Sequence, residues 1–208
     1  MAEKGVDAAT VLEIVADAEV SQPSFYNHFD SKEALVQAIV SEFFDAELSL
    51  KERVRKESED RAESIAANCR RSVRALVGDP VVAWVIVRAG NMRNLLRSPV
   101  EDPLMREITE GVEAGRFRVS DLRAMTAAIR GAALSIIQDV LEGQAGPEPD
   151  ARFAELVLRM LGLTPAEAER LAFASLPDFL ETDERPPVAS SIERAGRRKS
   201  PAKGPLDP

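Results

Sequence analysis

Apolar residues recur every three or four positions along most of this chain, and that spacing predicts amphipathic helices. Glycine, proline and serine residues interrupt the pattern at intervals, as they do at turns between helices. The longer predicted helices are 32–57, 61–77, 80–89, 104–114, 121–141 and 151–161, with a shorter one after Thr164. No segment alternates apolar and polar residues as a strand does, so the sequence predicts an all-α fold.

The segment 10–32 predicts two short helices joined by a tight turn, followed by the start of a third helix. Thr10 and Glu13 have the spacing of a capping box at the start of the first helix. Ser21 is placed to cap the second helix, with Pro23 in its first turn, where a missing N–H does no harm. This order is that of a helix-turn-helix, whose second helix enters the major groove of DNA. The alternative is an ordinary three-helix packing unit with polar outer faces.

The residues of this segment resemble the DNA-binding domain of TetR/AcrR-type transcriptional regulators. The resemblance implies a helix-turn-helix domain followed by a helical domain that binds a small effector and dimerises. The matching residues are Thr10, Val11, Ile14, Ala18, Val20, Ser21, Tyr26, His28, Phe29, Ser31, Lys32, Glu33 and Leu35.

The resemblance also implies which residues contact DNA. Those that match backbone-holding positions, which fix register without reading sequence, are Thr10, Tyr26, His28 and Lys32. Those on the second helix that would face base edges are Gln22, Pro23, Ser24 and Asn27, with Ser21 as the cap of that helix. A glutamine in the major groove can pair with adenine, and a serine with several bases. For His28 the alternative is a solvent-facing or otherwise satisfied histidine, and as the one histidine of the chain it excludes a histidine-based metal cluster.

The segment departs from the family pattern in three places. Glu19 stands where the family usually has glycine, and a left-handed backbone there costs a non-glycine residue about 1 kcal/mol. Pro23 replaces another common glycine. The family also places a full helix before the motif, so we expect that the first helix is largely absent and that the native protein begins upstream. Residues 1–50 carry two lysines and ten carboxylates, a formal charge of −8, which is awkward for a phosphate-binding surface.

The composition of the chain is that of a water-soluble cytoplasmic protein. Its 208 residues have a formal net charge of −8, which argues against indiscriminate nucleic-acid binding. The one cysteine, Cys69, excludes an intramolecular disulfide framework, fits a reducing compartment, and is better explained as a small buried residue than as a catalytic thiol. Residues 1–10 lack the apolar core of a secretory signal, and no apolar run approaches the length of about 20 residues that spans a bilayer. We expect no cofactor, metal or membrane partner.

We expect three parts along the chain: a DNA-binding domain in residues 1–46, a helical effector-binding and dimerisation domain in 47–177, and a disordered tail in 178–208. Two helices from each subunit, 121–141 and 151–161, could form a four-helix dimer interface, although their apolar faces could instead pack within one subunit. The tail is rich in proline, serine and arginine. It is either a solvated tail or a basic arm that contacts DNA without sequence preference.

The effector site is less sharply indicated. Bulky, adaptable side chains often line apolar ligand pockets, although methionine at helical spacing is more often plain core. Arg88 lies beside a strongly apolar helix and needs a partner, which could be an anionic effector, a buried carboxylate or the solvent at a helix end. The candidate effector-binding residues are Trp84, Arg88, Asn91, Met92, Met105 and Met125.

These features together predict a ligand-responsive transcriptional regulator that binds a double-stranded, palindromic operator as a homodimer. A repressor released by a small-molecule effector is the leading interpretation. The alternative is a relative of the same fold that binds a ligand or a protein and has lost DNA binding, as the acidic and shortened DNA-binding domain would suggest. An enzyme has little support, because the sequence shows no phosphate-binding glycine loop, no metal-ligand cluster and no catalytic triad order.

Overall fold

The computed structural model describes residues 9–88 and 102–181, and every regular element within these ranges is a helix. This confirms the predicted all-α fold. The helices are α1 (Val11–Asp17), α2 (Gln22–His28), α3 (Lys32–Glu57), α4 (Arg61–Val77), α5 (Pro80–Arg88), α6 (Pro103–Glu113), α7 (Leu122–Leu141), α8 (Pro149–Met160), α9 (Pro165–Ala172) and α10 (Asp178–Glu181).

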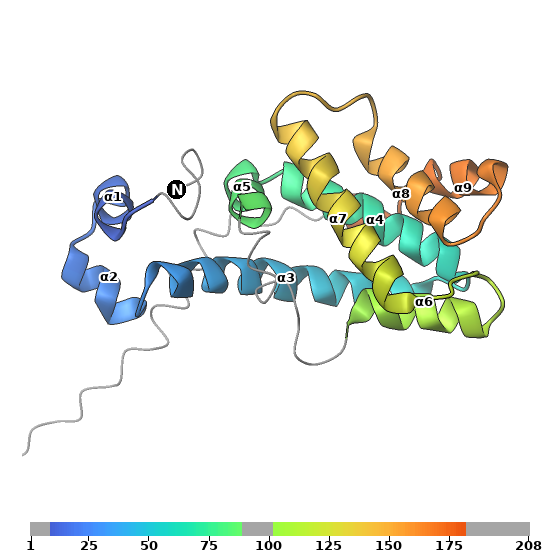
Figure 1. Cartoon of the computed structure of the whole chain (residues 1–208), viewed down its shortest axis with the longest axis horizontal. Coiled ribbons are helices and arrows are strands. Elements are labelled where there is room, and N and C mark those ends of the chain that lie inside the picture. The colour runs from blue at the N-terminus through green and yellow to red at the C-terminus, as the bar shows by residue number, and fades with distance from the viewer. Residues whose placement is uncertain (1–8, 89–101, 182–208) are drawn as a thin grey trace, which may run out of the picture.

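The helices form a small group at one end of the molecule and a larger group at the other, joined by α3 (Figure 1). Helices α1 and α2 lie beside the start of α3, and we call these two helices with the first turns of α3 the head. The 26 residues of α3 extend from there beneath α5 to the larger group, which we call the body. A helix of this length spans about 39 Å, so α3 can carry a displacement in the body to the head.

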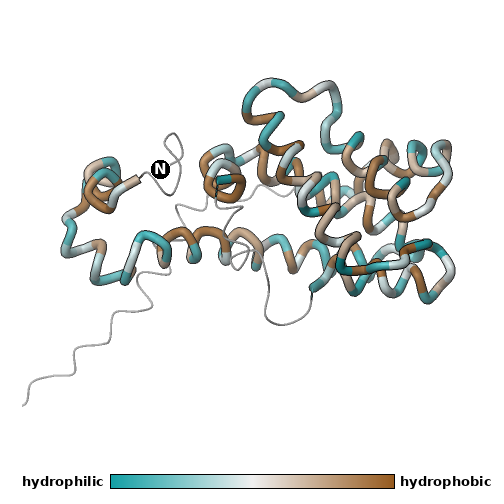
Figure 2. Tube along the Cα trace, viewed as in Figure 1, coloured by the Kyte–Doolittle hydropathy of each residue, from teal (hydrophilic) through white to brown (hydrophobic). Residues whose placement is uncertain are grey.

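Two apolar cores hold the body together. The larger core lies among α4, α6, α7, α8 and α9 and includes Ile65, Ile108, Phe153 and Leu158. The second lies where α5 packs against α3 and α7, around Val40 and Ile86, and Figure 2 shows the apolar stretch of α3 opposite α5. Since α3 contributes to this second core, the connecting helix is packed into the body and is not a free linker.

The last described helix lies within the segment predicted to be a disordered tail. Residues 178–181 form α10, and Leu180 is buried with Leu176, Val54 and Ala67 in a small third core. The prediction of disorder was therefore wrong for these four residues, because one buried leucine ties them to α3 and α4. The rest of the predicted tail, 182–208, lies outside the described residues.

Helix α7 is apolar yet largely uncovered. Its buried residues are Thr126, Ile129 and Ile137, while small residues such as Ala128 and Gly131 are exposed. By length and composition alone α7 could cross a bilayer, a test that core and interface helices of water-soluble proteins also pass. Among the described residues, none covers one face of α7.

Candidate functional site

The first helix of the head begins with the predicted capping box. The Glu13 backbone N–H donates to Thr10 Oγ1 at 3.3 Å, and the Thr10 N–H donates to Glu13 Oε2 at 3.0 Å. Two of the free N–H groups at the start of α1 are thereby satisfied. Val15 is buried beneath this helix, whereas Thr10 is exposed at its tip.

The turn between α1 and α2 adopts the backbone that favours glycine. Glu19 has φ +53°, its N–H donates to Ala16 O at 3.2 Å, and the Val20 N–H donates to Val15 O at 3.0 Å. These paired bonds form a Schellman motif with a left-handed residue after the helix end. The structure therefore confirms the expected left-handed turn residue at Glu19, held in a conformation that strains a side-chain-bearing residue.

Helix α2 packs against the rest of the head through one side, and its other side is exposed to solvent. Phe25 is buried and packs against Phe29 with ring centroids 5.7 Å apart, while the Ser24 N–H donates to Ser21 Oγ at 3.2 Å. The predicted DNA-contacting residues of this helix that are exposed are Ser21, Gln22, Pro23, Tyr26, Asn27 and His28, and Ser24 is half-buried. The side chains predicted to face bases thus share an outward surface on a helix fixed from beneath.

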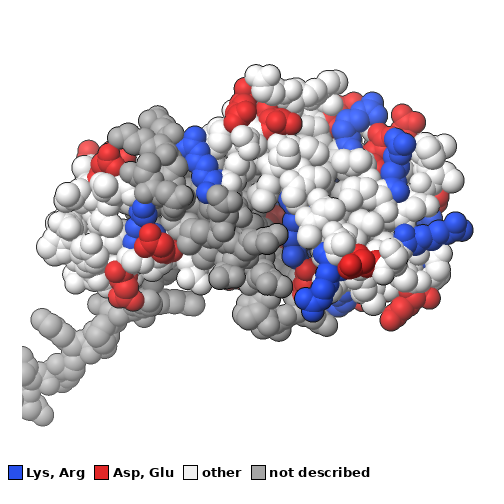
Figure 3. Space-filling view, in the orientation of Figure 1, with Lys and Arg blue, Asp and Glu red and all other residues white. Residues whose placement is uncertain are grey.

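Lys32 differs from the other predicted phosphate contacts. It is half-buried, and its Nζ donates to the carbonyl oxygen of Ala9 at 3.0 Å, which ties the start of α3 to the start of α1. Lys32 is the one lysine or arginine among the described residues 9–50, and the acidic side chains of Asp30 and Glu33 are exposed close to it in sequence. Figure 3 shows acidic side chains on the head and charges of both signs on the body.

The predicted effector-binding residues are only partly described. Trp84 and Arg88 lie together on α5, with the Arg88 guanidinium 4.3 Å from the centroid of the Trp84 ring, and both are half-buried. Met105 on α6 and Met125 on α7 are also half-buried, and these two helices pack together. Asn91 and Met92 lie outside the described residues.

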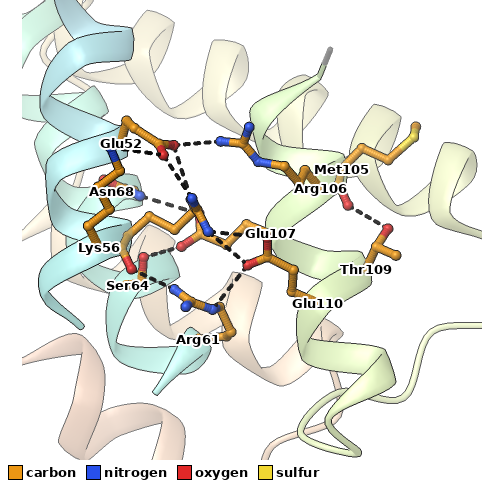
Figure 4. A network of polar contacts seen from close by, with 11 residues as sticks. Glu52, Lys56, Arg61, Ser64, Asn68, Met105, Arg106, Glu107, Thr109 and Glu110 are labelled. Atoms are coloured by element: carbon orange, nitrogen blue, oxygen red, sulfur yellow. Dashed lines mark hydrogen bonds and ion pairs between the residues drawn. The ribbon is translucent and has the colours of Figure 1, made fainter. Parts of the chain in front are cut away.

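A buried polar cluster between α4 and α6 was not predicted from the sequence. Glu107 accepts hydrogen bonds from Ser64 Oγ and, at 3.3 Å, from Asn68 Nδ2, and all three residues are buried (Figure 4). Burial raises the pKa of the Glu107 carboxyl, and the hydrogen bonds from Ser64 and Asn68 oppose that rise. A carboxyl in this setting favours its neutral form more than an exposed glutamate does.

Further charged side chains surround this cluster. Burial lowers the pKa of the Lys51 ammonium, with Cys69 and Glu107 opposing the shift and Arg130 and Arg71 adding to it. Burial also raises the pKa of the Cys69 thiol to about 12, which keeps it neutral and unreactive, as expected of a buried structural cysteine. Arg71 forms a buried ion pair with Glu47 at 3.5 Å. Helix α4 therefore carries buried polar side chains beside the apolar residues that it contributes to the larger core.

An ion-pair network joins α3 to α6 next to the buried cluster (Figure 4). Arg55 on α3 donates to both carboxylate oxygens of Glu110 at 3.2 Å and to Glu52 Oε1 at 2.7 Å. Arg106 on α6 donates to Glu52 Oε2 at 2.6 Å, and Arg61 pairs with Glu110 at 3.2 Å. Glu107 lies on the same helix as Arg106 and Glu110, so one helix carries both the buried cluster and the contacts with α3.

One sequence signal could have indicated the buried cluster. Ser64, Asn68 and Arg71 recur at helical spacing and form a polar stripe next to the apolar stripe of α4 that includes Ile65 and Cys69. A helix with a polar stripe that turns out to be buried must find polar partners elsewhere in the chain. The partner residue, Glu107, lies 39 residues beyond Asn68, so local pattern could not identify it.

Comparison with known protein families agrees with this geometry. Residues 1–39 match the family described as bacterial regulatory proteins, tetR family, and residues 60–173 match the tetracyclin repressor-like C-terminal domain. The second match alone covers more than half of the 208 residues. The chain belongs to the TetR family.

Solved structures and a curated relative support the assignment to the TetR family. The chain is 31% identical to RolR, with a TM-score of 0.68 over 85% of this chain and 92% of RolR crystallised without ligand. RolR has also been crystallised with resorcinol, and that structure matches equally well. A gamma-butyrolactone receptor (ArpA-like protein), 18% identical, shares the fold with a TM-score of 0.62 over 88% of this chain and 91% of the receptor.

A shorter match concerns the N-terminal part of the TetR-family chain. It is 50% identical over 42 residues to the HTH-type transcriptional repressor DhaR of Mycobacterium sp. (strain GP1). That match spans 20% of this chain and 21% of DhaR, so it bears on one domain only. The family and these relatives make the protein a ligand-responsive, DNA-binding transcriptional regulator.

Proposed function

We propose that this TetR-family regulator is a repressor that binds a palindromic operator as a homodimer and leaves it when a small molecule enters the body. The observation that carries the DNA-binding part is the exposed outer face of α2, where Gln22 and Asn27 lie on a helix anchored by Phe25. Helices of this kind read base edges in the major groove. We assign base reading to Gln22, Pro23, Ser24 and Asn27, and backbone contacts to Thr10, Ser21, Tyr26, His28 and Lys32.

We propose the three parts expected from the sequence: a DNA-binding head in residues 1–46, an effector-binding and dimerisation body in 47–177, and a basic tail in 178–208. Helix α3 runs unbroken across residue 46, so the two parts share one rigid element. The head has little positive charge of its own, since Lys32 is the one lysine or arginine in 9–50. The tail carries Arg194, Arg197 and Lys199 among its basic residues, and we propose that it adds phosphate attraction which the head lacks.

We assign the dimer interface to α7 and α8. The exposed side of α7 is lined by small residues that allow close helix approach, namely Ala124, Ala127, Ala128, Gly131 and Ser135. On the neighbouring α8, Leu156 is 44% exposed. Two such helices from each subunit would bury these faces in a four-helix interface. A two-fold dimer of this kind fits a palindromic site, because each head then meets one half-site.

We propose that the effector is a small hydroxylated aromatic compound bound in the body. RolR, whose solved structures include a complex with resorcinol, is the relative that supports this class. Trp84, Arg88, Met105 and Met125 remain candidate lining residues, together with Asn91 and Met92. Binding would favour a dimer whose recognition helices no longer match half-sites one helical turn apart.

Other roles have less support. No observation on the described part of the chain favours a relative that has lost DNA binding. We expect a soluble, cytoplasmic protein without catalytic activity, resident cofactor or membrane partner, in keeping with the TetR family in general.

The experiment that tests this function is selection of binding sites from random duplex DNA by the full chain, followed by mobility-shift titration with the selected site. A palindromic consensus bound at nanomolar affinity, and lost on adding effector, is the expected result. Absence of any enriched sequence, with equal binding to scrambled duplexes, would exclude sequence-specific repression. The same titration on DNA flanking the gene then identifies the natural operator.

A further inference from the structure

One charged side chain lies in the apolar stripe through which α3 packs against the body. The residues of this stripe recur at alternating intervals of four and three, which is the spacing of a heptad seam between helices. Five of the six are apolar, and the sixth is a glutamate that is only 1% exposed. They are Val36, Val40, Phe43, Glu47, Leu50 and Val54. A buried carboxylate in such a seam needs a partner on the facing helix.

That partner is Arg71 on α4. Its Nη2 lies 3.5 Å from Glu47 Oε1, and the two side chains are 9% and 1% exposed. By contrast, the Arg55–Glu52 pair on the same helix has side chains that are 22% and 29% exposed. Salt and water therefore screen the Glu47–Arg71 pair less than they screen the pairs nearer the surface.

The pair lies between two apolar contacts on the seam of α3 and α4. On α3, Phe43 belongs to the core shared with α5, and Val54 belongs to the small core shared with α10. On α4, Leu76 and Ala67 belong to the same two cores, in the reverse order along the chain. The two helices therefore run in opposite directions along this seam, with the ion pair between the apolar contacts.

The apolar contacts alone would fix the position of α3 loosely. Burial of apolar area has no preferred direction, so one aliphatic contact can replace another when a helix tilts or slides. A buried ion pair resists the same movement, because separating its members leaves charge uncompensated in the interior. A single buried polar position in a helix seam can specify register at a cost in stability. The Glu47–Arg71 pair has that character.

The head lies at the far end of the same helix. Lys32 begins α3 and lies 15 residues before Glu47, so about 22 Å of helix separates the pair from the head. A tilt of about 10° at the pair would move the start of α3 by about 4 Å, which is close to the rise of about 3.4 Å per base pair. A small freedom at the pair would therefore change the position of the head by about one base pair.

We propose that the Glu47–Arg71 pair fixes the head on the body and thereby limits the regulator to one half-site spacing in its operator. This proposal rests on the proposed function and deepens it by naming the residues that set the spacing. The exposed side chains of α2 recognise the half-site, and this pair determines the distance between half-sites. Both of its members are positioning residues, since they are buried in the body.

Unfolding in urea separates positioning from stabilisation. Glu47→Leu and Arg71→Met each leave one buried charge behind, so each should lower the urea midpoint. The double variant replaces both charges with apolar side chains and should recover the midpoint of the unmodified chain. Glu57→Leu is the matched control for loss of a carboxylate from α3, because Glu57 pairs with Arg53 within that helix and both side chains are more than half exposed. It should leave the midpoint unchanged.

Pulsed electron spin resonance measures the position of the head without DNA. Spin labels at Asp17→Cys on α1 and Glu169→Cys on α9, both exposed sites, report the distance between head and body. Dilution with unlabelled chain keeps each measured pair within one subunit, and the buried Cys69 stays unlabelled. We expect one narrow distance distribution for the unmodified chain and for Glu57→Leu. The distribution of the double variant should broaden or shift by about 4 Å, the displacement that the tilt produces.

Binding to operators of altered spacing measures the consequence for DNA. Mobility-shift titrations use the selected palindrome and versions with one base pair added or removed between the half-sites. We expect the unmodified chain to lose about tenfold or more in affinity for each altered spacing, and the double variant to lose less than about threefold. A pair that only stabilised the fold would leave the first ratio unchanged in the double variant.

Three results would overturn the proposal. They are a distance distribution in the double variant that matches the unmodified chain, an unchanged preference for one spacing, and a double variant that does not fold, because the pair would then supply stability itself. If any of these accompanies binding of a palindrome by the unmodified chain, the repressor function stands and the inference falls. If the unmodified chain binds no palindrome but the distribution broadens or shifts in the double variant, the positioning role stands and the repressor function falls.

Discussion

Arg55 on α3 binds the carboxylate of Glu110 on α6, and so connects the helix that leads to the head with the body. Its Nη1 donates to both Glu110 carboxylate oxygens, each at 3.2 Å, while its Nε and Nη2 donate to Glu52 at 3.0 and 2.7 Å. Two of these four hydrogen bonds connect α3 to α6, and the two to Glu52, which lies on α3 itself, hold the guanidinium in place. Since α3 also carries the head, this arginine is where a movement of α6 would be passed on.

Replacing Arg55 with methionine should weaken the link between effector and operator. We expect Arg55→Met to leave effector binding in place but to reduce the effect of effector on operator affinity by about fivefold or more. The free energy of unfolding should fall by about 1 kcal/mol, because the network is partly solvent-exposed. Parallel measurement of effector affinity with and without operator gives the coupling directly.

Lys56→Met serves as the control for Arg55→Met. Lys56 reaches the same Glu52 at 3.8 Å, but its side chain is 69% exposed. We expect its replacement to change neither stability nor coupling measurably. If effector changes operator affinity equally in Arg55→Met and in the unmodified chain, the ion-pair network does not transmit the effect of the effector.

The network should also give stability a dependence on acid pH. Hydrogen bonding to Arg55 lowers the pKa of Glu52 from 4.5 to about 2, against the opposing effect of desolvation. A carboxyl whose pKa is lower in the folded state stabilises the fold above its unfolded pKa. That stabilisation is present above about pH 4.5 and is lost as the pH falls towards 2. In urea titrations, the difference in unfolding free energy between the unmodified chain and Glu52→Gln should shrink over that interval.

Glu107 should give a pH dependence of stability opposite to that of Glu52. Burial raises the pKa of Glu107 above 4.5 in the folded protein, so the folded state holds its proton to higher pH than the unfolded state does. Its contribution is complete below pH 4.5 and declines as the pH rises towards the folded pKa. Glu107→Gln should therefore gain relative stability at neutral pH, and a Glu52-like acid profile for this variant would contradict the assignment of burial as the cause.

Local sequence was enough to predict most of the fold. The helices 32–57 and 61–77 coincide with α3 and α4, because Ser31 caps one, Asp60 caps the other, and an apolar stripe runs along each. The start of α8 was predicted less accurately, since the predicted helix began at residue 151 and the observed one begins at Pro149. Glu148 before it has φ +53° and makes no side-chain cap, so the proline at the first position is the start signal that remains.

The polar interior of the body could not be predicted in the same way. Ser64 and Asn68 form hydrogen bonds with Glu107, and Arg55 forms them with Glu110. In each case the two partners lie on helices that are far apart in sequence. Such partners are fixed by tertiary packing. The resemblance to the family could predict a DNA-contacting face on α2, because the residues of that face lie within one short segment.

Glu19→Gly should stabilise the head. Glu19 occupies a left-handed backbone position at φ +53°, which glycine adopts without steric cost. We expect a gain of about 1 kcal/mol in the free energy of unfolding, measured by urea titration followed by circular dichroism. Ala16→Gly is the matched control, since Ala16 is exposed within α1 and should lose about 1 kcal/mol. A loss of stability in both variants would contradict the strain assigned to Glu19.

Gly131→Arg should prevent formation of the proposed α7–α8 dimer. Gly131 is exposed on α7, and a Cβ built there has no neighbour within 4 Å in the subunit, so the subunit can accept a side chain. An arginine would hold two closely packed α7 helices apart and add like charges across the two-fold axis. Sedimentation should show a folded monomer, whereas Gly131→Ala should remain a dimer. A dimeric Gly131→Arg would place the interface elsewhere.

The central claim is that the outer face of α2 reads base sequence in duplex DNA. The most direct measurement is fluorescence anisotropy of the full chain on its selected operator and on a scrambled duplex, for the unmodified protein, Gln22→Ala, Asn27→Ala and Tyr26→Phe. We expect each base-reading variant to lose about 1–3 kcal/mol of operator binding with little change on scrambled DNA, and Tyr26→Phe to weaken both duplexes alike. Equal affinity of the unmodified chain for both duplexes, or an unchanged preference in Gln22→Ala and Asn27→Ala, would contradict the claim.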